Sequence, residues 1–540
     1  MPDASEIKRR HATLQGAKTP HESVWNSCYA VTFPSRGSGL QGTQIVSAAD
    51  SQQQKAQRIY DSTAPDAVKT GAATVMGSMV PSNALWFGLD MGQESDEERR
   101  FLDVIAQFIW ENIHSSNFDA EAFDAVVDAF VAGWFVLYLD ELPDGGFYFE
   151  TFPIGECSVA STRSGGRVDT LYRLFEYGVG QCVDKYGIDK VSEGTRQKYI
   201  AGKIDDTVKI LFAIEPRMDY VAGGRMAKNK PFASYHVECD ANVTLRESGY
   251  DEFPCMVPRW MRIPGSAYAT GPMSDALPDV NSLNEVARFT LLGAETAIAP
   301  PLKVVDDGVI NARNLKIGPR KVIVCAEPDN IQPLITGANI KAGELTSDKL
   351  GAKVRKILFA DQLPPMDGPV RTATEWSMRV QAVRAVMGPM FGRFEAEWLQ
   401  PLIERAFGIV WRANIRSGFS LVGKPPQSML NRSFSIRYLS PLARSQKMVE
   451  VDAMDRYEAT LGQEAAVDPG VLDVYDWQEA ARARAQLLGV PQKLVRDKRA
   501  TLAIQQQKAA QAAAQQQDAV QQQGQVALQE AAAKRVAMAA

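Results

Sequence analysis

Two glycine-rich stretches are the first places where this sequence could bind a phosphate group. Residues 37–42 read GSGLQG and match the G-x-G-x-x-G pattern of dinucleotide sites. Such a site needs a buried strand before the glycines and a helix after them, but Pro34 and Ser35 precede this stretch, which predicts a flexible loop. Residues 418–425 read GFSLVGKP, and Pro425 stands where a phosphate loop needs Ser or Thr for magnesium. We therefore expect a turn here and no nucleotide cofactor.

The other residues that could do chemistry are four histidines and three acidic clusters. The histidines never approach metal-ligand spacing with one another or with cysteine: His11, His21, His114 and His236. The acidic clusters are residues 96–98, 140–141 and 205–206, which fall in predicted helix starts or turns. Solvated surfaces are the commoner role for such clusters, although acid–base or metal chemistry stays open. We expect no metal and no catalytic residue, and thus not an enzyme.

Basic residues concentrate between positions 303 and 356 of a chain whose formal net charge is −5. A predicted helix carries Lys349, Lys353, Arg355 and Lys356, and the irregular segment before it carries Lys303, Arg313, Lys316, Arg320 and Lys321. The negative net charge excludes the broadly basic surface that binds nucleic acid nonspecifically. Local contact with phosphates and ordinary surface or interface ion pairs both remain open for this region.

Length and composition indicate a large soluble protein. The 540 residues suggest about three to four domains or one elongated architecture. The N-terminal residues are charged and lack a secretory signal, and the longest apolar run, residues 130–139, is about half of a membrane span. The six cysteines are far apart in the sequence, which predicts reduced, buried thiols: Cys28, Cys157, Cys182, Cys239, Cys255 and Cys325.

Hydrophobic periodicity predicts a mixed α+β, helix-dominated fold. Helices are expected at 64–80, 94–114, 118–133, 274–298 and 342–360, in a long segment from 371, and again over 447–540. The long segment should kink at Gly388-Pro389 and at Pro401. Residues 134–263 are expected to be mainly β or α+β, beginning with two strands around a Pro-Asp-Gly-Gly turn. Residues 417–446 read as irregular and extended, and the acids at 96–98 as a solvated helix start.

The predicted elements follow a distinctive order: helix 274–298, a short irregular insert, helix 342–360, a proline-rich loop and a long kinked helix. Residues 253–302 carry it most clearly, with a strand, a turn reading YATGP and a helix containing Leu283, Asn284 and Glu285. Further support comes from VMGSMVPSNALWFGL, RTATEWSMRVQ and EWLQPLIERAF. Together these segments resemble the portal, or head-to-tail connector, proteins of short-tailed bacteriophages.

The resemblance implies a ring, usually of twelve subunits, at one vertex of the virion capsid, assembled in the host cytoplasm. Residues 1–273 would form the wing, 274–298 and 342–360 the stem, and 299–341 the clip. Residues 361–370 would be the tunnel loop, 371–446 a long wing helix with its return segment, and 447–540 the crown. The ring would nucleate head assembly, dock the packaging motor and pass double-stranded DNA during packaging and ejection.

The resemblance also suggests contact residues. The stem residues Lys349, Lys353, Arg355 and Lys356 are candidates for the DNA channel or for bridges between subunits, and the clip residues Arg313, Lys316, Arg320 and Lys321 for docking terminase or tail adaptors. The tunnel loop consists of Asp361, Gln362, Leu363, Pro364, Pro365, Met366, Asp367, Gly368, Pro369 and Val370. Expected partners are further copies of the chain, DNA, the major capsid and scaffolding proteins, terminase and the tail adaptors, without a membrane.

Two other readings remain open at the level of sequence. A nucleotide-driven DNA-packaging enzyme would need the phosphate loop that Pro425 interrupts, and another virion structural protein, such as a core or tail component, would tolerate the absence of motifs. The C-terminal residues 505–540 contain 25 Gln or Ala residues. Such a helix is marginal alone but can pack against identical copies, so we expect a helical barrel reaching at least Ala514, with Gly524 as a break.

Overall fold

A computed structural model describes residues 3–37, 40, 58–83, 85–90, 96–142, 145–221, 224, 226–300, 302–304, 331–333, 340–362, 388, 390–430, 437–438, 441–466, 468–487, 501, 504–508 and 510–511. The chain divides into two compact units. The first comprises Met1–Leu85 and Ile109–Gly418, and the second Trp86–Phe108 and Phe419–Ala540. Helices predominate and several sheets accompany them, which confirms the predicted mixed α+β class.

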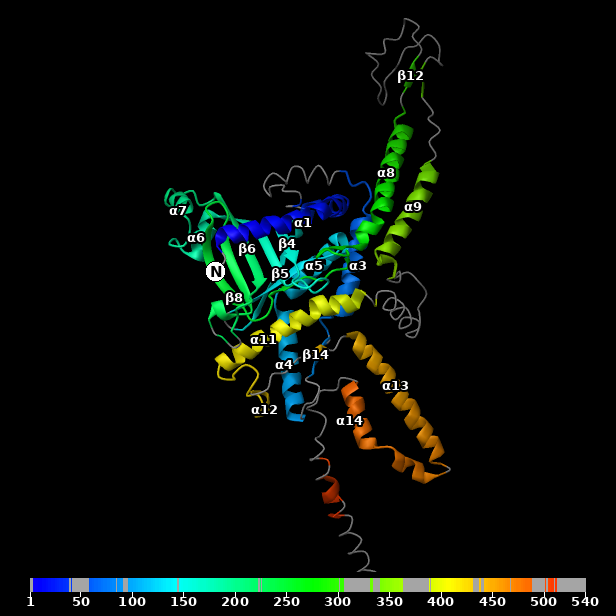
Figure 1. Ribbon diagram of the computed structural model, residues 1–540. Helices are drawn as coiled ribbons and strands as arrows, with labels where there is room; N and C mark the ends of the chain where they lie inside the picture. Colours follow the sequence, from blue (N-terminus) through cyan, green and yellow to red (C-terminus); the bar gives the residue numbers. More distant parts are fainter. Residues whose placement is uncertain are drawn as a thin grey trace, which may run out of the picture. The chain divides into compact units, whose positions relative to one another are not determined.

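An antiparallel five-stranded sheet forms the β-rich part of the first unit. Its order is β4 (Cys157–Ala160), β5 (Thr170–Gly178), β6 (Thr207–Pro216), β7 (Phe232–Glu238) and β8 (Val243–Tyr250). Helix α1 (Ala4–Ala30) covers one face, where Ala4 and Ile7 pack among Leu211, Tyr235 and their neighbours (Figure 1). This helix was not among those predicted from hydrophobic periodicity. Its apolar stripe is interrupted by Lys18 and Glu22, which are themselves buried.

A second, three-stranded sheet packs on the opposite face of the first. Its order is β3 (Phe147–Phe152), β2 (Val136–Glu141) and β9 (Cys255–Met256). Phe212 of β6 contacts the rings of Tyr138 and Phe152 at centroid distances of 6.1 and 6.4 Å. This confirms the two predicted strands at 134–153 and the β-rich region. Smaller elements here are α6 (Val179–Tyr186), α7 (Glu193–Ile200), the β10–β11 pair (Met261–Arg262, Ala269–Thr270), and the 3-10 helices η1 (Pro34–Gly37), η3 (Ile154–Glu156) and η4 (Ala227–Asn229).

Helix α5 (Phe118–Ala132) lies at the centre of the first unit. Every residue from Ala125 to Ala132 is buried, including Asp128, whose carboxylate accepts hydrogen bonds from Tyr29 and Arg36. It contacts α1, α3 (Thr63–Met79), α8 (Pro272–Ile298) and both strands of the β2–β3 hairpin. The central helix therefore connects the sheets to the helices that follow.

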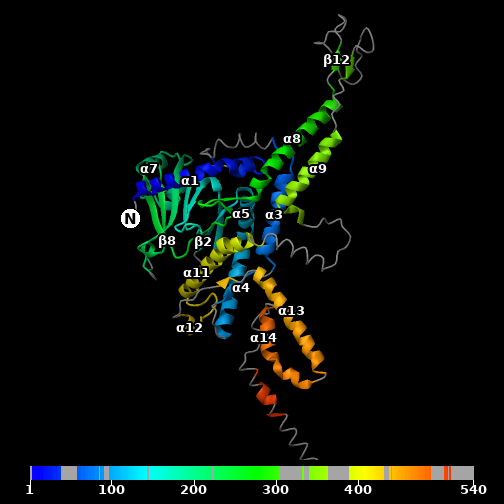
Figure 2. The same ribbon diagram turned by 45° about the vertical axis from the view of Figure 1, so that its right-hand side comes forward.

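Helices α8 and α9 (Ile340–Ile357) form an antiparallel hairpin and contact each other along their length. Both views show the two helices side by side, projecting from the rest of this unit (Figures 1 and 2). A two-stranded ribbon follows α8, in which β12 (Leu302–Val304) pairs with β13 (Ile331–Pro333). The 3-10 helix η6 (Ala360–Gln362) follows α9. The observed helices agree with the predicted ranges 274–298 and 342–360.

Helix α11 (Gln400–Arg416) closes the first unit. The helix is irregular directly before Pro401, where it passes through the π-helical turn η7 (Glu395–Leu399). Pro401 lies in the first turn of α11, where its missing N–H is tolerated. Pro389 and residues 371–387 lie outside the described residues.

The second unit contains mainly helices. Strand β1 (Leu89–Asp90) pairs with β14 (Arg437–Tyr438), and the unit includes α4 (Asp96–Ser115) as far as Phe108. Its other elements are α12 (Gln427–Leu430), α13 (Pro441–Glu464), the 3-10 helix η8 (Pro469–Val474) and α14 (Trp477–Leu487). Residues 504–508 and 510–511 are helical, while Ala514 and Gly524 lie outside the described residues.

Two expectations about the second unit need correction. The stretch 417–446 is not wholly irregular, since α12 and the start of α13 fall within it. The acidic start of α4 is not wholly solvated either, because Glu98 is buried and accepts a hydrogen bond of 2.6 Å from the Ser428 hydroxyl. A carboxylate that is buried with a hydrogen-bond donor has a structural role, and the sequence alone did not reveal its partner.

Candidate functional site: the helical hairpin and its base

The four basic residues of the predicted stem all lie on α9, and their side chains are exposed: Lys349, Lys353, Arg355 and Lys356. Lys353 reaches across the hairpin, where its Nζ lies 2.8 Å from Asp279 Oδ1 on α8. Within the part of the chain that the structure describes, the other three have no ion-pair partner.

Helical geometry divides the four residues among different sides of α9. Lys353 and Arg355 are two positions apart, which is a turn of about 200° around the helix axis. Lys349 and Lys356 are seven positions apart and lie within about 20° of the same direction. One flat partner therefore cannot contact all four. That some of them face DNA stays a prediction, and Lys353 and Arg355 cannot both do so from the same side.

The start of α8 is fixed to the end of α5 by two glycines that meet backbone to backbone. Gly133 ends α5 with φ of +90°, and a Cβ there would lie 2.2 Å from the carbonyl carbon of Thr270. A Cβ on Gly271, the N-cap of α8, would lie 2.6 Å from the Phe130 carbonyl oxygen. Only glycine permits such an approach at either position. The turn YATGP noted in the sequence ends at this contact.

The end of α9 is fixed in a similar way. Gly71 of α3 faces the Phe130 ring and the residue that follows α9, since a Cβ there would lie 2.6 Å from Phe130 Cε1 and 2.7 Å from the Leu358 carbonyl oxygen. Val354 and Leu358 are fully buried at this place. The two helices of the hairpin are thus both held at their base by α3 and α5, while their upper parts extend beyond them (Figure 2).

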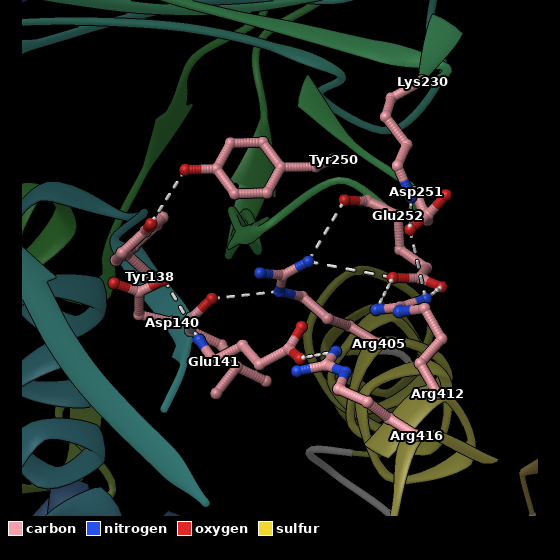
Figure 3. Close-up of polar contacts among 11 residues, drawn as sticks. Tyr138, Asp140, Glu141, Lys230, Tyr250, Asp251, Glu252, Arg405, Arg412 and Arg416 are labelled. Atoms are coloured by element: carbon pink, nitrogen blue, oxygen red, sulfur yellow. Dashed lines mark hydrogen bonds and ion pairs between the residues drawn. The ribbon is translucent and has the colours of Figure 1, made fainter. Parts of the chain in front are cut away.

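A cluster of arginines fixes α11 to the sheets, and we call it the α11 clamp (Figure 3). Arg405 Nε donates to the Leu139 carbonyl oxygen at 3.0 Å, and its guanidinium lies over the Tyr250 ring. Arg412 donates to both carboxylate oxygens of Glu252, at 2.5 and 3.0 Å. Two further pairs surround these contacts: Arg416 with Glu141 at 2.8 Å, and Lys230 with Asp251. The clamp joins β2, the end of β8 and α11.

Charge and burial in the α11 clamp shift several pKa values. Burial opposes the charge of Arg412, but hydrogen bonds to Glu252 and the charges of Glu252 and Asp251 outweigh it and raise the pKa of the guanidinium. Burial, together with the neighbouring Tyr250, raises the pKa of Tyr138 well above its usual value. The hydroxyls of these two tyrosines are 3.0 Å apart. The Arg412 guanidinium therefore stays charged and the Tyr138 hydroxyl stays protonated near neutral pH, which suits a structural role.

A buried ion pair holds the π-helical turn in place. The Arg259 guanidinium donates to Glu397 through Nε at 3.0 Å and through Nη2 at 2.5 Å, and the side chains are 1% and 9% exposed. The backbone N–H of Arg259 donates to the same carboxylate at 3.1 Å, and Nη2 also donates to the Gly166 carbonyl oxygen. Neither residue was singled out in the sequence, because the two are 138 positions apart and belong to no motif.

The histidines occupy structural positions. His236 is stacked on Phe212 and hydrogen-bonded to the Tyr186 hydroxyl at 2.8 Å, and burial lowers its pKa to about 3. Burial likewise lowers the pKa of His11 to about 4. His114 Nδ1 lies 2.9 Å from Asp119, and His21 Nε2 lies 3.2 Å from the Ser266 hydroxyl.

The structure also bears on the predictions about metal sites, the glycine-rich stretch at 418–425, the cysteines and membrane spans. Within the described residues, no group of three or more His, Cys, Asp or Glu side chains is arranged to hold a metal. A helix, α11, precedes the GFSLVGKP stretch, which is a turn with φ values of +68° at Gly418 and +88° at Gly423, as predicted. Five of the cysteines are buried free thiols, and Cys325 lies outside the described residues. No helix that the structure describes is long and apolar enough to cross a bilayer.

Several predicted contact residues cannot be placed. The clip residues lie outside the described part of the chain: Arg313, Lys316, Arg320 and Lys321. Of the predicted tunnel loop, Asp361 and Gln362 belong to η6, and residues 363–370 lie outside the described part. In the GSGLQG stretch, Gly37 ends η1, whereas Gly39 and Gly42 also lie outside it.

The hairpin also exposes the large apolar side chains of Phe289, Leu291, Leu292 and Leu345, and exposed apolar patches commonly mark sites of interaction with other molecules. Residues 4–495 match a family described as bacteriophage head to tail connecting protein, and the chain belongs to this family. It is 28% identical over 477 residues to the probable portal protein of Bordetella phage BPP-1, covering 84% of this chain and 82% of that protein. It is 26% identical over 532 residues to the portal protein of Salmonella phage epsilon15, covering 94% and 92%.

Proposed function

We propose that this chain is the portal subunit of a bacteriophage and that copies of it form a ring at one vertex of the capsid. The family match over residues 4–495 is the observation that carries this proposal. The portal proteins of two phages, matched over most of their length, support it further. Double-stranded DNA would enter and leave the head through the centre of the ring, which usually contains twelve subunits.

The proposed ring assigns a role to each part of the chain. Residues 1–273 form the wing, 274–298 with 342–360 the stem, 299–341 the clip, and 447–540 the crown. The rigid base of the α8–α9 hairpin supports a stem assignment, since stem helices around a channel need a fixed direction. The α11 clamp and the Arg259–Glu397 pair would keep the wing rigid while DNA moves.

The proposed partners follow from this position in the virion. The wing would meet the major capsid and scaffolding proteins, and the clip would meet terminase during packaging and tail adaptors afterwards. The basic residues Arg313, Lys316, Arg320 and Lys321 are candidates for the clip contacts. We place the chain with structural proteins, so that the energy for packaging comes from a separate ATPase.

Electrostatics is compatible with a channel through which DNA slides. A protein with a net charge of −5 makes few strong contacts with the phosphates of DNA, and each additional contact would hold the DNA more tightly. A few exposed cations, such as Arg355, would centre the duplex without stopping it. Screening at physiological salt limits each such contact to about 8 Å.

Electron microscopy of the purified chain tests this proposal. We expect closed rings with an axial hole, and a native mass that is a whole multiple of the subunit mass. A phosphate-release assay with ATP and DNA should give no turnover by the purified chain. Monomers or filaments under all assembly conditions, or multiple turnovers of ATP, would contradict the portal assignment.

A further inference from the structure

Arg262 is a partly buried cation that lacks a counter-charge. It lies on β10, opposite Ala269 of β11. Its Nε atom is buried and has no hydrogen-bond partner, and among the residues that the structure describes no carboxylate lies within ion-pair distance of its guanidinium. Removing a charge from water without pairing it is costly. The unpaired guanidinium therefore indicates a place where an anion from outside the chain binds.

The neighbouring Arg259 shows how this chain pairs a buried arginine when the pair is structural. Glu397 accepts hydrogen bonds from the backbone N–H, Nε and Nη2 of Arg259. Arg259 Nη2 also donates to the Gly166 carbonyl oxygen at 2.7 Å. Its carboxylate partner is thus fully used by Arg259. Two arginines on one short segment therefore differ, since Arg259 has a buried carboxylate and Arg262 has none.

The Arg262 guanidinium lies against the loop that joins β4 to β5. This loop reads STRSGGR over residues 161–167. A Cβ on Gly165 would lie 2.8 Å from Arg262 Nη2, so the missing side chain leaves room for the guanidinium. Gly165 also has φ of +73°, a left-handed conformation that favours glycine. The glycine thus brings the loop backbone close to the unpaired cation.

The same loop supplies further donors and contains no acid. The side chains of Thr162, Arg163 and Ser164 are exposed, and in the described part of the chain none of the three donates a side-chain hydrogen bond or forms an ion pair. Asp169, the first acid after the loop, accepts from the Thr162 backbone N–H at 3.0 Å and from the Thr170 hydroxyl at 3.1 Å. These bonds fix the loop and leave its hydroxyls and Arg163 available to a ligand.

We propose that Arg262 and the loop 161–167 form a binding site for a phosphate group. A guanidinium presents paired N–H donors that match two oxygens of an oxyanion. The hydroxyls and Arg163 of the loop add donors from a second element. A tetrahedral phosphate has enough oxygens for both sets of donors, whereas a carboxylate would be satisfied by the guanidinium alone. The site belongs to a single subunit, so it stands independently of the proposed ring.

A free phosphate ion fits this site better than the backbone of a nucleic acid. Because Arg262 is partly buried and its Nε is inaccessible, the ligand has to enter beside the loop to reach the remaining N–H groups. Acidic side chains also lie nearby, since Glu404 is 3.9 Å from Arg167 and Glu397 pairs with Arg259. A long polyanion would meet these negative charges, whereas a single small ion avoids them.

Urea unfolding of the complete chain, with and without millimolar inorganic phosphate, tests the site. Phosphate should raise the unfolding midpoint of the unmodified chain, because it binds the folded form. Arg262→Met should abolish this response. Without phosphate, its midpoint should equal or exceed that of the unmodified chain, since the substitution removes a partly buried charge that has no partner. Sodium chloride at the same ionic strength controls for screening.

Arg259→Met is the matched control for the sign of the stability change. It removes a paired arginine from the same segment and should lower the midpoint in phosphate-free buffer. If Arg262→Met lowers the midpoint there as strongly as Arg259→Met does, Arg262 has a structural partner and the proposal is overturned. A phosphate response of full size in Arg262→Met would overturn it as well.

Calorimetric titration with inorganic phosphate measures the affinity directly. Arg262→Met should weaken binding roughly tenfold or more, because it removes hydrogen bonds from a charged group. Ser164→Ala changes only an exposed hydroxyl, so the chain should fold normally and bind phosphate about two- to tenfold more weakly. Unchanged affinity in Ser164→Ala would contradict the role of the loop, and no binding by the unmodified folded chain would overturn the site.

A short DNA duplex, titrated in place of inorganic phosphate, distinguishes the two sources of the phosphate group. We expect no duplex binding that depends on Arg262. Duplex binding that Arg262→Met abolishes, without binding of inorganic phosphate, would overturn the assignment to a free ion.

Discussion

The contact between Gly133 and the start of α8 allows a sharp prediction about how the hairpin is held. Gly133→Ala introduces a Cβ at 2.2 Å from Thr270 carbonyl carbon, in a backbone conformation with φ of +90°. The left-handed conformation costs about 1–2 kcal/mol and the steric overlap about 1–3 kcal/mol. The free energy of unfolding should therefore fall by about 2–5 kcal/mol. The neighbouring atoms are backbone, which cannot move aside as a flexible side chain would.

Gly202→Ala is the matched control for this prediction. Gly202 has φ of +77° and also follows the end of a helix, α7, but a Cβ there meets nothing within 4 Å. Gly202→Ala should lower the free energy of unfolding only by the cost of the left-handed backbone conformation, about 1–2 kcal/mol. Urea unfolding followed by tryptophan fluorescence measures both variants, and the fully buried Trp134 reports directly on this region. Equal destabilisation by the two substitutions would refute the close packing at the base of α8.

Three further predictions concern the first unit. Arg259→Met leaves the Glu397 carboxylate buried without its partner and should destabilise the subunit by about 3–5 kcal/mol in urea unfolding; a loss below 1 kcal/mol would contradict this account. His236 stays neutral down to about pH 3 in the folded chain, whereas in the unfolded chain it protonates below about pH 6.5. The free energy of unfolding should therefore fall as the pH drops from about 6.5 to about 3. Thermal melts of His236→Phe should show a smaller decline over this range. Arg412→Met, in a half-buried pair, should cost about 1–3 kcal/mol, whereas the exposed Arg416→Met should cost under about 1 kcal/mol; the reverse order would count against the α11 clamp.

The helices of the hairpin could be predicted from the sequence because their signals are local. Apolar periodicity and the turn ending at Gly271 define α8, and the charged pattern from Glu344 to Lys356 defines α9. The same reasoning found α4, α5 and the β2–β3 hairpin. In each case, neighbouring residues carry enough information about burial to fix the element.

The contacts that hold the elements together could not be predicted in this way. The Arg259–Glu397 pair and the approach of Gly133 to Thr270 join positions more than 130 residues apart, and nothing near either position announces its partner. Helix α1 was missed for a related reason. Its buried Lys18 is satisfied by Glu22 and by the Gly155 carbonyl oxygen at 2.6 Å, so a charged residue occupies a core position that sequence patterns assign to solvent.

The place of the chain within the phage particle tests the central claim most directly. Particles carrying a small electron-dense label on the C-terminus of this chain can be imaged together with particles assembled without the chain. The portal assignment predicts a label at a single vertex of each particle, and heads that contain no DNA when the chain is omitted. Label spread over many vertices or along the tail, or normal DNA content without the chain, would contradict it.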